Sequence, residues 1–431
     1  MKMDTRSKAL AAQKAFHKLS SADADLKNAA LAAIERELRS RAAIIFEANA
    51  QDLAAAKSDN LPAPLQKRLK FDEEKLAEVC AGLESLRTIE DPVGRIISAR
   101  ELDERLELYQ VACPIGVIGV IFESRPDALV QISSLCLKSG NAVLLKGGSE
   151  ASNTNRALAD AIAEAARSVA VPDGWIQLLE TRTEIGEMLK LDSYVDLIIP
   201  RGSNEFVKYI MDNTNIHVLG HADGICHAYI HSDADKEKAA KIIVDSKTQY
   251  VAVCNALETL LVHRDIAKEA LPLLKKELEG AGVLLKGCDI TREFIDVDAA
   301  GGDDWETEYL DLVLSIKVVD GFSDAVDHIN THGSHHTDTI ITEDRNTAER
   351  FMDSVDSANV FFNCSTRFSD GYRYGLGAEV GIGTGKVHAR GPVGIEGLLI
   401  YKWKLYGDGQ IVADYSGPNA KRFTHRSITD A

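Results

Sequence analysis

The side chain with the clearest chemical potential is the thiol of Cys254, which lies within TQYVAVCNALETLLVH at 248–263. A cysteine acts as a nucleophile when it has thiolate character and an open path to its target, and a turn with free backbone N–H groups can supply both. Cys254 follows an apolar run and precedes a strand expected over 256–262. This position favours a nucleophile, although free cysteines are more often buried packing residues.

The other six cysteines do not indicate a second kind of chemistry. They are widely spaced, the total of seven is odd, and no C-x-x-C pair indicates zinc or a disulfide framework. The histidine-rich segment HINTHGSHH at 328–336 raises the question of a metal site, but no carboxylate or thiol completes a ligand set there. We therefore expect reduced thiols and no metal.

The composition excludes several classes of function. The chain has 431 residues, of which 45% are hydrophobic, so it is long enough for two or more packed domains. Its formal net charge of -17 opposes binding to DNA or RNA, because such binding requires clustered Lys and Arg that neutralise phosphates. We expect a globular protein with no nucleic-acid partner.

The N-terminal stretch MKMDTRSKALAAQKAFHKL has neither the apolar core nor the small-residue cleavage site of a secretory leader. No segment reaches the roughly 18 apolar residues of a membrane span. We therefore expect a cytoplasmic protein with no membrane partner.

Alternating strands and helices must position the cysteine. Helical spacing over 22–57 predicts one long amphipathic helix, and alternation over 100–111 predicts a hairpin. Buried strands at 115–122 and 141–148 alternate with helices, and this pattern continues to a strand at 225–231. Strands that alternate with helices are typical of parallel sheets built from βαβ units.

We expect three segments. Residues 1–228 form a doubly wound α/β domain that contains the 100–111 hairpin, 229–392 form a second α/β domain with Cys254, and 393–431 return to the first domain; the resemblance described below implies that the first binds the cofactor and the second is catalytic. The hairpin and the C-terminal stretch EGLLIYKWKLYGDGQ form a small β oligomerisation element, because an extended edge can pair with another subunit. This predicts a homo-oligomer, either a dimer or a tetramer.

Several motifs resemble the aldehyde dehydrogenase superfamily. The stretch CPIGVIGVIFESRP and the stretch KSGNAVLLKGGSEASNTN, within 113–155, are similar to its cofactor-binding core. The resemblance implies an α/β fold of the aldehyde dehydrogenase type, with Lys146 on the adenosine ribose and Glu308 on the nicotinamide ribose. It also places Gly202 and Ser203 beside the pyrophosphate, where the N–H groups of a helix N-terminus approach an anion.

Within that superfamily, the stretches at 249–263, 319–342 and 363–398 resemble the gamma-glutamyl phosphate reductases. The resemblance implies NADP(H)-dependent reduction of L-glutamyl 5-phosphate to L-glutamate 5-semialdehyde through a Cys254 thioester, the second step of proline biosynthesis. It also implies a glutamate 5-kinase as a partner, because an acyl phosphate is labile.

The chain departs from the wider superfamily at two positions. An oxyanion-binding asparagine is replaced by the turn FESRP, which places Ser124 or Arg125 near the oxyanion; we expect Ser124 to contact the cofactor and Arg125 the substrate. The glutamate that activates the hydrolytic water in the wider superfamily is replaced by His221. The absence of this glutamate suits an enzyme whose acyl-thioester exchanges with phosphate and not with water. We also expect Asn255 and Arg367 to bind substrate, because a guanidinium matches a carboxylate.

Two other functions remain open at this stage. One is a hydrolytic or CoA-acylating aldehyde dehydrogenase with another substrate. A requirement for phosphate would distinguish the reduction of L-glutamyl 5-phosphate from this alternative. The other is a catalytically silent cofactor-binding scaffold in which Cys254 only packs.

Overall fold

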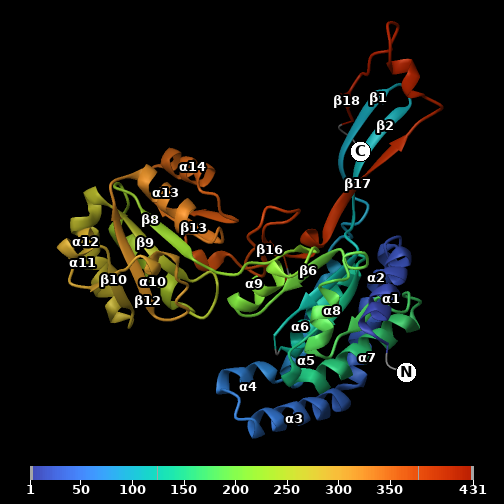
Figure 1. Ribbon diagram of the computed structural model, residues 1–431, viewed down its shortest axis with the longest axis horizontal. Coiled ribbons are helices and arrows are strands. Elements are labelled where there is room, and N and C mark those ends of the chain that lie inside the picture. Colours follow the sequence, from blue (N-terminus) through green and yellow to red (C-terminus); the bar gives the residue numbers. More distant parts are fainter. Residues whose placement is uncertain (1–2, 124, 377, 429–431) are drawn as a thin grey trace.

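The computed structural model describes residues 3–123, 125–376 and 378–428, which form two α/β lobes and a long β arm (Figure 1). The first lobe lies beneath the arm, and the second lobe extends to one side. In the described part of the chain, no helix is long and apolar enough to cross a membrane.

The first lobe is built on a parallel sheet whose strands run in the order β5-β4-β3-β6-β7. Its three inner strands are buried along their whole length, as expected for a parallel sheet covered on both faces. The strands are β3 (Val117–Ile121), β4 (Ala142–Lys146), β5 (Ile176–Leu178), β6 (Leu197–Pro200) and β7 (His217–Val218).

Helices cover both faces of this sheet (Figure 1). The helices of the first lobe are α1 (Thr5–Leu19), α2 (Ala24–Ser40), α3 (Ala42–Ser58), α4 (Ala63–Leu69), α5 (Glu73–Thr88), α6 (Pro126–Lys138), α7 (Ser152–Ser168), α8 (Arg182–Met188) and α9 (Asn204–Asp212). Of these, α3 packs on α7 and α4 packs on α3.

The single helix predicted over 22–57 is wrong, because the chain forms α2 and α3 with a break at Arg41. The backbone of Arg41 leaves the helical region with φ -95° and ψ 12°. The break lets both helices pack on α7, and α3 buries two polar side chains, Asn49 and Asp52. The apolar spacing continues across the break, so periodicity alone did not reveal it.

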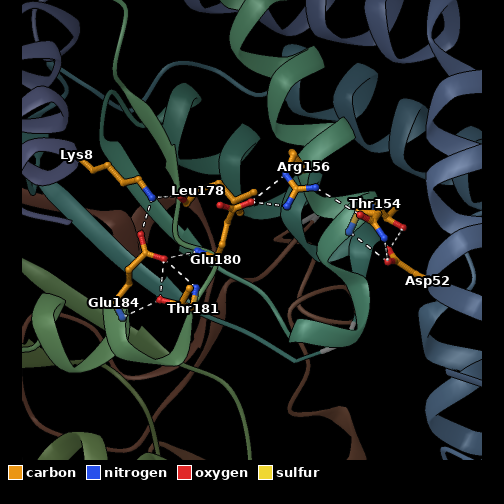
Figure 2. Close-up of polar contacts among 9 residues, drawn as sticks. Lys8, Asp52, Thr154, Arg156, Leu178, Glu180, Thr181 and Glu184 are labelled. Carbon is orange, nitrogen blue, oxygen red and sulfur yellow. Dashed lines mark hydrogen bonds and ion pairs between the residues drawn. The ribbon is translucent and has the colours of Figure 1, made fainter. Parts of the chain in front are cut away.

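Polar side chains join the outer elements of the first lobe (Figure 2). Lys8 of α1 donates to the carbonyl of Leu178 at 2.8 Å and to Glu184 of α8 at 2.6 Å. Asp52 of α3 accepts the backbone N–H of Thr154 at 2.8 Å. Asp52 therefore caps α7, whose own N-cap residue makes no side-chain hydrogen bond.

The second lobe holds an all-parallel sheet in the order β11-β10-β12-β9-β8-β13-β14. The strands are β8 (Cys226–Ile230), β9 (Leu257–His263), β10 (Leu284–Gly287), β11 (Asp298–Ala299), β12 (Val313–Val319), β13 (Thr337–Ile341) and β14 (Asn359–Phe362). The helices are α10 (Lys236–Thr248), α11 (Arg264–Gly280), α12 (Asp289–Phe294), α13 (Phe322–His332) and α14 (Arg345–Ser354).

The strand expected at 225–231 was placed in the wrong domain. It forms β8, which pairs with β9 and β13 near the centre of the second sheet. A buried strand has the same continuous apolar pattern in either sheet, so the sequence pattern did not indicate which sheet it joins.

The arm is a four-stranded antiparallel sheet, β17-β2-β1-β18. The hairpin predicted at 100–111 is confirmed as β1 (Ile96–Asp103) and β2 (Leu106–Pro114). The C-terminal stretch supplies β17 (Leu399–Tyr406) and β18 (Arg426–Ser427). One edge of β17 pairs with β2, and the other edge has no partner strand within the described residues.

The first lobe is made from two separate parts of the chain. After the second lobe, the chain returns through the short pair β15 (Gly381–Gly383) and β16 (Gly391–Val393). Val380, Val393 and Leu398 then join the hydrophobic core of the first lobe. The second lobe is therefore inserted between the segments that build the first.

Candidate active site

Cys254 lies in the turn that immediately precedes β9, as predicted. This turn packs closely on the link between the lobes, because a Cβ on Gly224 would come within 2.5 Å of the Cys254 Cα. The Cys226 thiol donates to the Cys254 carbonyl at 3.2 Å. The close approach at Gly224 and this hydrogen bond hold the Cys254 backbone in place.

Two histidines lie beside Cys254. A ring nitrogen of His221 and of His336 and the Cys254 Sγ all lie within 4.8 Å of one another. The two rings meet edge to face, with centroids 4.9 Å apart. Burial lowers the pKa of both imidazoles, so both rings are neutral at pH 7.

The surroundings of Cys254 favour the thiol over the thiolate. Burial raises the pKa of Cys254 to about 12, and the carboxylates of Glu308 and Glu379 act in the same direction. The guanidinium of Arg201 acts in the opposite direction but does not outweigh them. The thiol therefore needs a proton acceptor at the moment of attack.

Arginines that interact with this site give it cationic character. Arg367 is 8% exposed, its Nε donates to Gln249 at 3.0 Å, and burial lowers its pKa. Burial also lowers the pKa of Arg201, whose charge interacts with Cys254 and Glu379. Arg125 is more exposed and pairs with Asp127 at 2.8 Å.

Asn255 makes two hydrogen bonds to the protein. Its side-chain amide nitrogen donates to the Ser369 carbonyl at 2.7 Å, and its backbone carbonyl accepts from the Thr366 hydroxyl at 2.8 Å. Its side-chain Oδ1 is buried and has no hydrogen-bond partner among the described residues. Thr366 begins the short 3-10 helix Thr366–Phe368, which contains Arg367. These contacts make Asn255 a support for the turn that carries Arg367, and the unpartnered Oδ1 is the atom that the predicted substrate contact would use.

The expected cofactor residues lie at the carboxyl ends of first-lobe strands. Lys146 ends β4, is buried, and donates to the Gly147 carbonyl. Gly202 and Ser203 separate β6 from α9, and Ser203 makes no side-chain cap bond at the N-terminus of that helix. Ser124 lies outside the described residues.

Glu308 bridges the two lobes. It extends from the loop before β12 and accepts a hydrogen bond from Asn204, the first residue of α9, at 2.6 Å. Asn204 also donates to Asp223 in the link between the lobes at 2.8 Å. The Glu308 carboxylate also interacts electrostatically with Cys254, so it connects the α9 N-terminus with the surroundings of the candidate nucleophile.

Sequence reasoning missed Arg201, His336 as a neighbour of Cys254, and Glu379. A signal existed for Arg201, because it directly follows β6 and the carboxyl ends of parallel strands line sites in α/β proteins. His336 was predicted only as part of the histidine-rich loop that, by resemblance, lines the active site, without Cys254 as its neighbour. Nothing local marks Glu379, which reaches the site through the returning chain.

The structure has two lobes, each built on a parallel sheet, with a cysteine turn between them. This arrangement defines the aldehyde dehydrogenase class, and a profile of the aldehyde dehydrogenase family matches residues 2–284. The chain belongs to this family, so the predicted fold and the predicted type of enzyme are confirmed. It is 62% identical over 426 residues to gamma-glutamyl phosphate reductase of Pelotomaculum thermopropionicum. The aligned region covers 99% of this chain and 98% of that relative.

Other relatives agree with this narrower resemblance. The chain is 60% identical over 411 residues to gamma-glutamyl phosphate reductase of Acetivibrio thermocellus, covering 95% of each. The crystal structure of gamma-glutamyl phosphate reductase from Thermotoga maritima superposes with a TM-score of 0.92 at 39% identity, covering 95% of this chain and 100% of that one. The predicted group within the superfamily is confirmed.

Proposed function

We propose that this protein reduces L-glutamyl 5-phosphate to L-glutamate 5-semialdehyde and phosphate, with NADPH as the reductant and Cys254 as the nucleophile. The observation that carries the proposal is a partly buried thiol beside two neutral imidazoles, together with the guanidinium groups of the half-buried Arg201 and the buried Arg367, whose charges interact with it. A substrate with a phosphate and a carboxylate matches two separate cations. The names of the relatives support the same reaction.

The residues present fit a dinucleotide. The first turn of α9 has no side-chain cap, so its N–H groups are free to meet a pyrophosphate. Gly202 leaves little space for a side chain, since a Cβ there would lie 3.0 Å from the Phe206 ring. Lys146 and Glu308 would hold the two riboses. When bound, the cofactor supplies a hydride to the acyl carbon.

In the first step, the Cys254 sulfur attacks the acyl carbon. The Nδ1 of His221 lies 2.9 Å from the Ile382 carbonyl, which can only accept, so Nδ1 carries the proton and Nε2 holds the lone pair. His221 Nε2 takes the thiol proton as the S–C bond forms. The C–O bond to phosphate breaks, and phosphate leaves with the electron pair, which gives a thioester.

In the second step, the thioester carbon is reduced and the C–S bond breaks. The aldehyde leaves, and the sulfur recovers its proton from His221. Arg367 holds the substrate carboxylate throughout and fixes the acyl carbon against the sulfur. Arg201 stabilises the leaving phosphate, which explains why a phosphate ion can also attack the thioester in the reverse direction.

The test is NADP reduction with L-glutamate 5-semialdehyde, with and without phosphate. We expect turnover only with phosphate, and loss of at least about a thousandfold in Cys254→Ser, since the hydroxyl is a much weaker nucleophile. Cys364→Ser, which changes another partly buried thiol, is the control and should keep its activity.

Each alternative predicts a different result. Turnover without phosphate would assign the protein to the hydrolytic aldehyde dehydrogenases, and turnover with CoA in place of phosphate to the CoA-acylating ones. No turnover with any acceptor would support a silent scaffold.

We also propose that the protein is a homo-oligomer that receives its substrate from a glutamate 5-kinase. The free edge of β17 supports oligomerisation. The lability of an acyl phosphate favours direct transfer from the kinase. Co-sedimentation of the two proteins should show a complex, and separate migration at micromolar concentrations would contradict direct transfer.

A further inference from the structure

The three side chains nearest the candidate nucleophile come from separate elements and together offer atoms that bind metals. Cys254 precedes β9, His221 lies in the link between the lobes, and His336 directly precedes β13. Their sulfur and ring nitrogens lie within 4.8 Å of one another. Among the described residues, no other group of His, Cys, Asp or Glu side chains meets this condition with three members.

His336 provides an independent indication that something binds here. Its side chain is fully buried, and its Nε2 has no hydrogen-bond partner among the described residues. Its Nδ1 is already engaged, 2.8 Å from the Thr337 hydroxyl. A buried polar atom without a partner is costly, so a ligand that accepts this lone pair would remove the cost.

His221 is oriented as metal-binding histidines are. Its Nδ1 donates to the Ile382 carbonyl at 2.9 Å, which leaves the lone pair on Nε2. A backbone carbonyl on the far ring nitrogen is the usual way in which proteins fix the tautomer and direction of a histidine ligand.

We propose that His221, Cys254 and His336 form a site for a zinc ion that reversibly blocks the nucleophile. One thiolate and two imidazoles are ligands that Zn²⁺ prefers, and three protein ligands leave a fourth position for water. This departs from the expectation of no metal. The histidine-rich segment supplies one ligand, and the thiol that completes the set comes from the turn before β9.

Zn²⁺ binding requires only a small rearrangement. A tetrahedral zinc ion with bonds of about 2.0–2.3 Å holds its ligand atoms roughly 3.3–3.8 Å apart, so the side chains must approach by about an ångström. The turn at 251–256 and the link at 219–225 are irregular segments, so their side chains can move without disturbing a strand.

Binding breaks the Cys254 S–H bond, releases the proton to solvent and forms a Zn–S bond, without any change of oxidation state. The metal then holds the electron pair that would attack an acyl carbon. The inhibition of catalysis by zinc therefore rests on the proposed function of Cys254, whereas the binding of zinc to the three side chains does not.

The experiment is a titration of the reduced, metal-free protein with Co²⁺ and then with Zn²⁺. We expect one Co²⁺ per chain, with a thiolate-to-cobalt charge-transfer band and the visible bands of tetrahedral cobalt, and stoichiometric Zn²⁺ should remove both. Cys254→Ser should lose the charge-transfer band. His336→Asn and His221→Gln should each bind at least tenfold more weakly.

The matched control is His332→Asn, because His332 lies in the same histidine-rich segment but pairs with Glu306 at 3.0 Å. Its titration should match that of the wild type. A circular dichroism spectrum will show whether each variant is folded. If His336→Asn does not fold, His221→Gln, which changes a partly exposed position, tests the proposal in its place.

A wild type without the charge-transfer band would overturn the proposal, as would equal binding by all the variants. The two proposals fail separately. A wild type that reduces acyl phosphate but shows no band has no metal site, whereas a wild type with the band but no turnover with any acceptor refutes only the proposed reaction.

Discussion

At the residue scale, Arg367 is the clearest case of a side chain whose burial needs an explanation. Its Nε bonds to Gln249, and it forms no ion pair with any carboxylate among the described residues. An unpaired cation in a buried setting is unfavourable, and burial accordingly lowers its pKa. Under the proposed function, the carboxylate of the substrate would supply the missing partner.

We expect Arg367→Lys to raise the KM for L-glutamate 5-semialdehyde about tenfold or more, because an ammonium cannot form the paired bonds that a guanidinium makes with a carboxylate. The measurement is steady-state kinetics at saturating NADP and phosphate. The exposed Arg345→Lys is the control and should leave KM unchanged. An unchanged KM in Arg367→Lys would show that the carboxylate binds elsewhere.

Sequence reasoning selected Cys254 because a turn before a strand is a local property and because the residues around it resemble a family motif. It also reached Glu308, through resemblance, and the structure places Glu308 beside the α9 N-terminus. It did not join His336 or Glu379 to Cys254, because their proximity is created by three chain segments that meet only in the fold. Ligand sets of this kind have no sequence spacing to detect.

At the element scale, the Lys8–Glu184 pair links α1 to α8 (Figure 2). Burial alone would raise the pKa of Glu184, but hydrogen bonds from Lys8 and from the backbone N–H groups of Thr181 and Glu180 outweigh it and lower the pKa to about 2. A carboxyl group with a lowered pKa stabilises the fold above its unfolded pKa and loses that effect as pH falls toward the folded value.

The wild type should therefore lose stability between about pH 4.5 and pH 2 in part through Glu184. Glu184→Gln should cost about 1–3 kcal/mol at pH 7 and reduce the loss on acidification, because the amide does not titrate. Thermal unfolding midpoints from pH 7 down to pH 3 measure both effects.

The control for this prediction is Glu343→Gln, which breaks the half-exposed pair with Lys238 and should change stability by less than about 1 kcal/mol. If Glu184→Gln and the wild type lost the same stability between pH 7 and pH 3, Glu184 would not be the titrating group.

Most elements were predictable from periodicity, because buried parallel strands are apolar runs and the helices between them repeat every three to four residues. Two features of the fold were not predictable from periodicity. The α2–α3 break at Arg41 leaves the apolar spacing intact, and β8 joins the second sheet through pairing with β9 and β13. Both are decided by tertiary packing, which a single segment does not encode.

At the scale of the whole molecule, the arm carries an open strand edge. Alternate residues of β17 place Tyr401, Trp403 and Leu405 on one face, each about half exposed. A free edge beside an apolar stripe favours pairing with another copy of the chain. The structure thus supports the predicted oligomer without fixing its size.

Trp403→Glu combined with Leu405→Glu should convert the oligomer to a monomer at micromolar concentrations, because both charges would be buried in the contact. Analytical ultracentrifugation measures the change. The control is Leu284→Glu, at an equally exposed apolar position on the second lobe. A wild type that sediments as a monomer, or a double variant that remains associated, would exclude this surface.

The insertion of the second lobe into the first has a consequence for the nascent chain. Domains generally fold as units while synthesis proceeds from the N-terminus. Here the core of the first lobe needs Val393, Ile395 and Leu398, which leave the ribosome only after the whole second sheet has been made. The second lobe can therefore complete its core first. Until the last residues emerge, the first lobe exposes the apolar surface that they will cover, and it is then that the growing chain most needs chaperones.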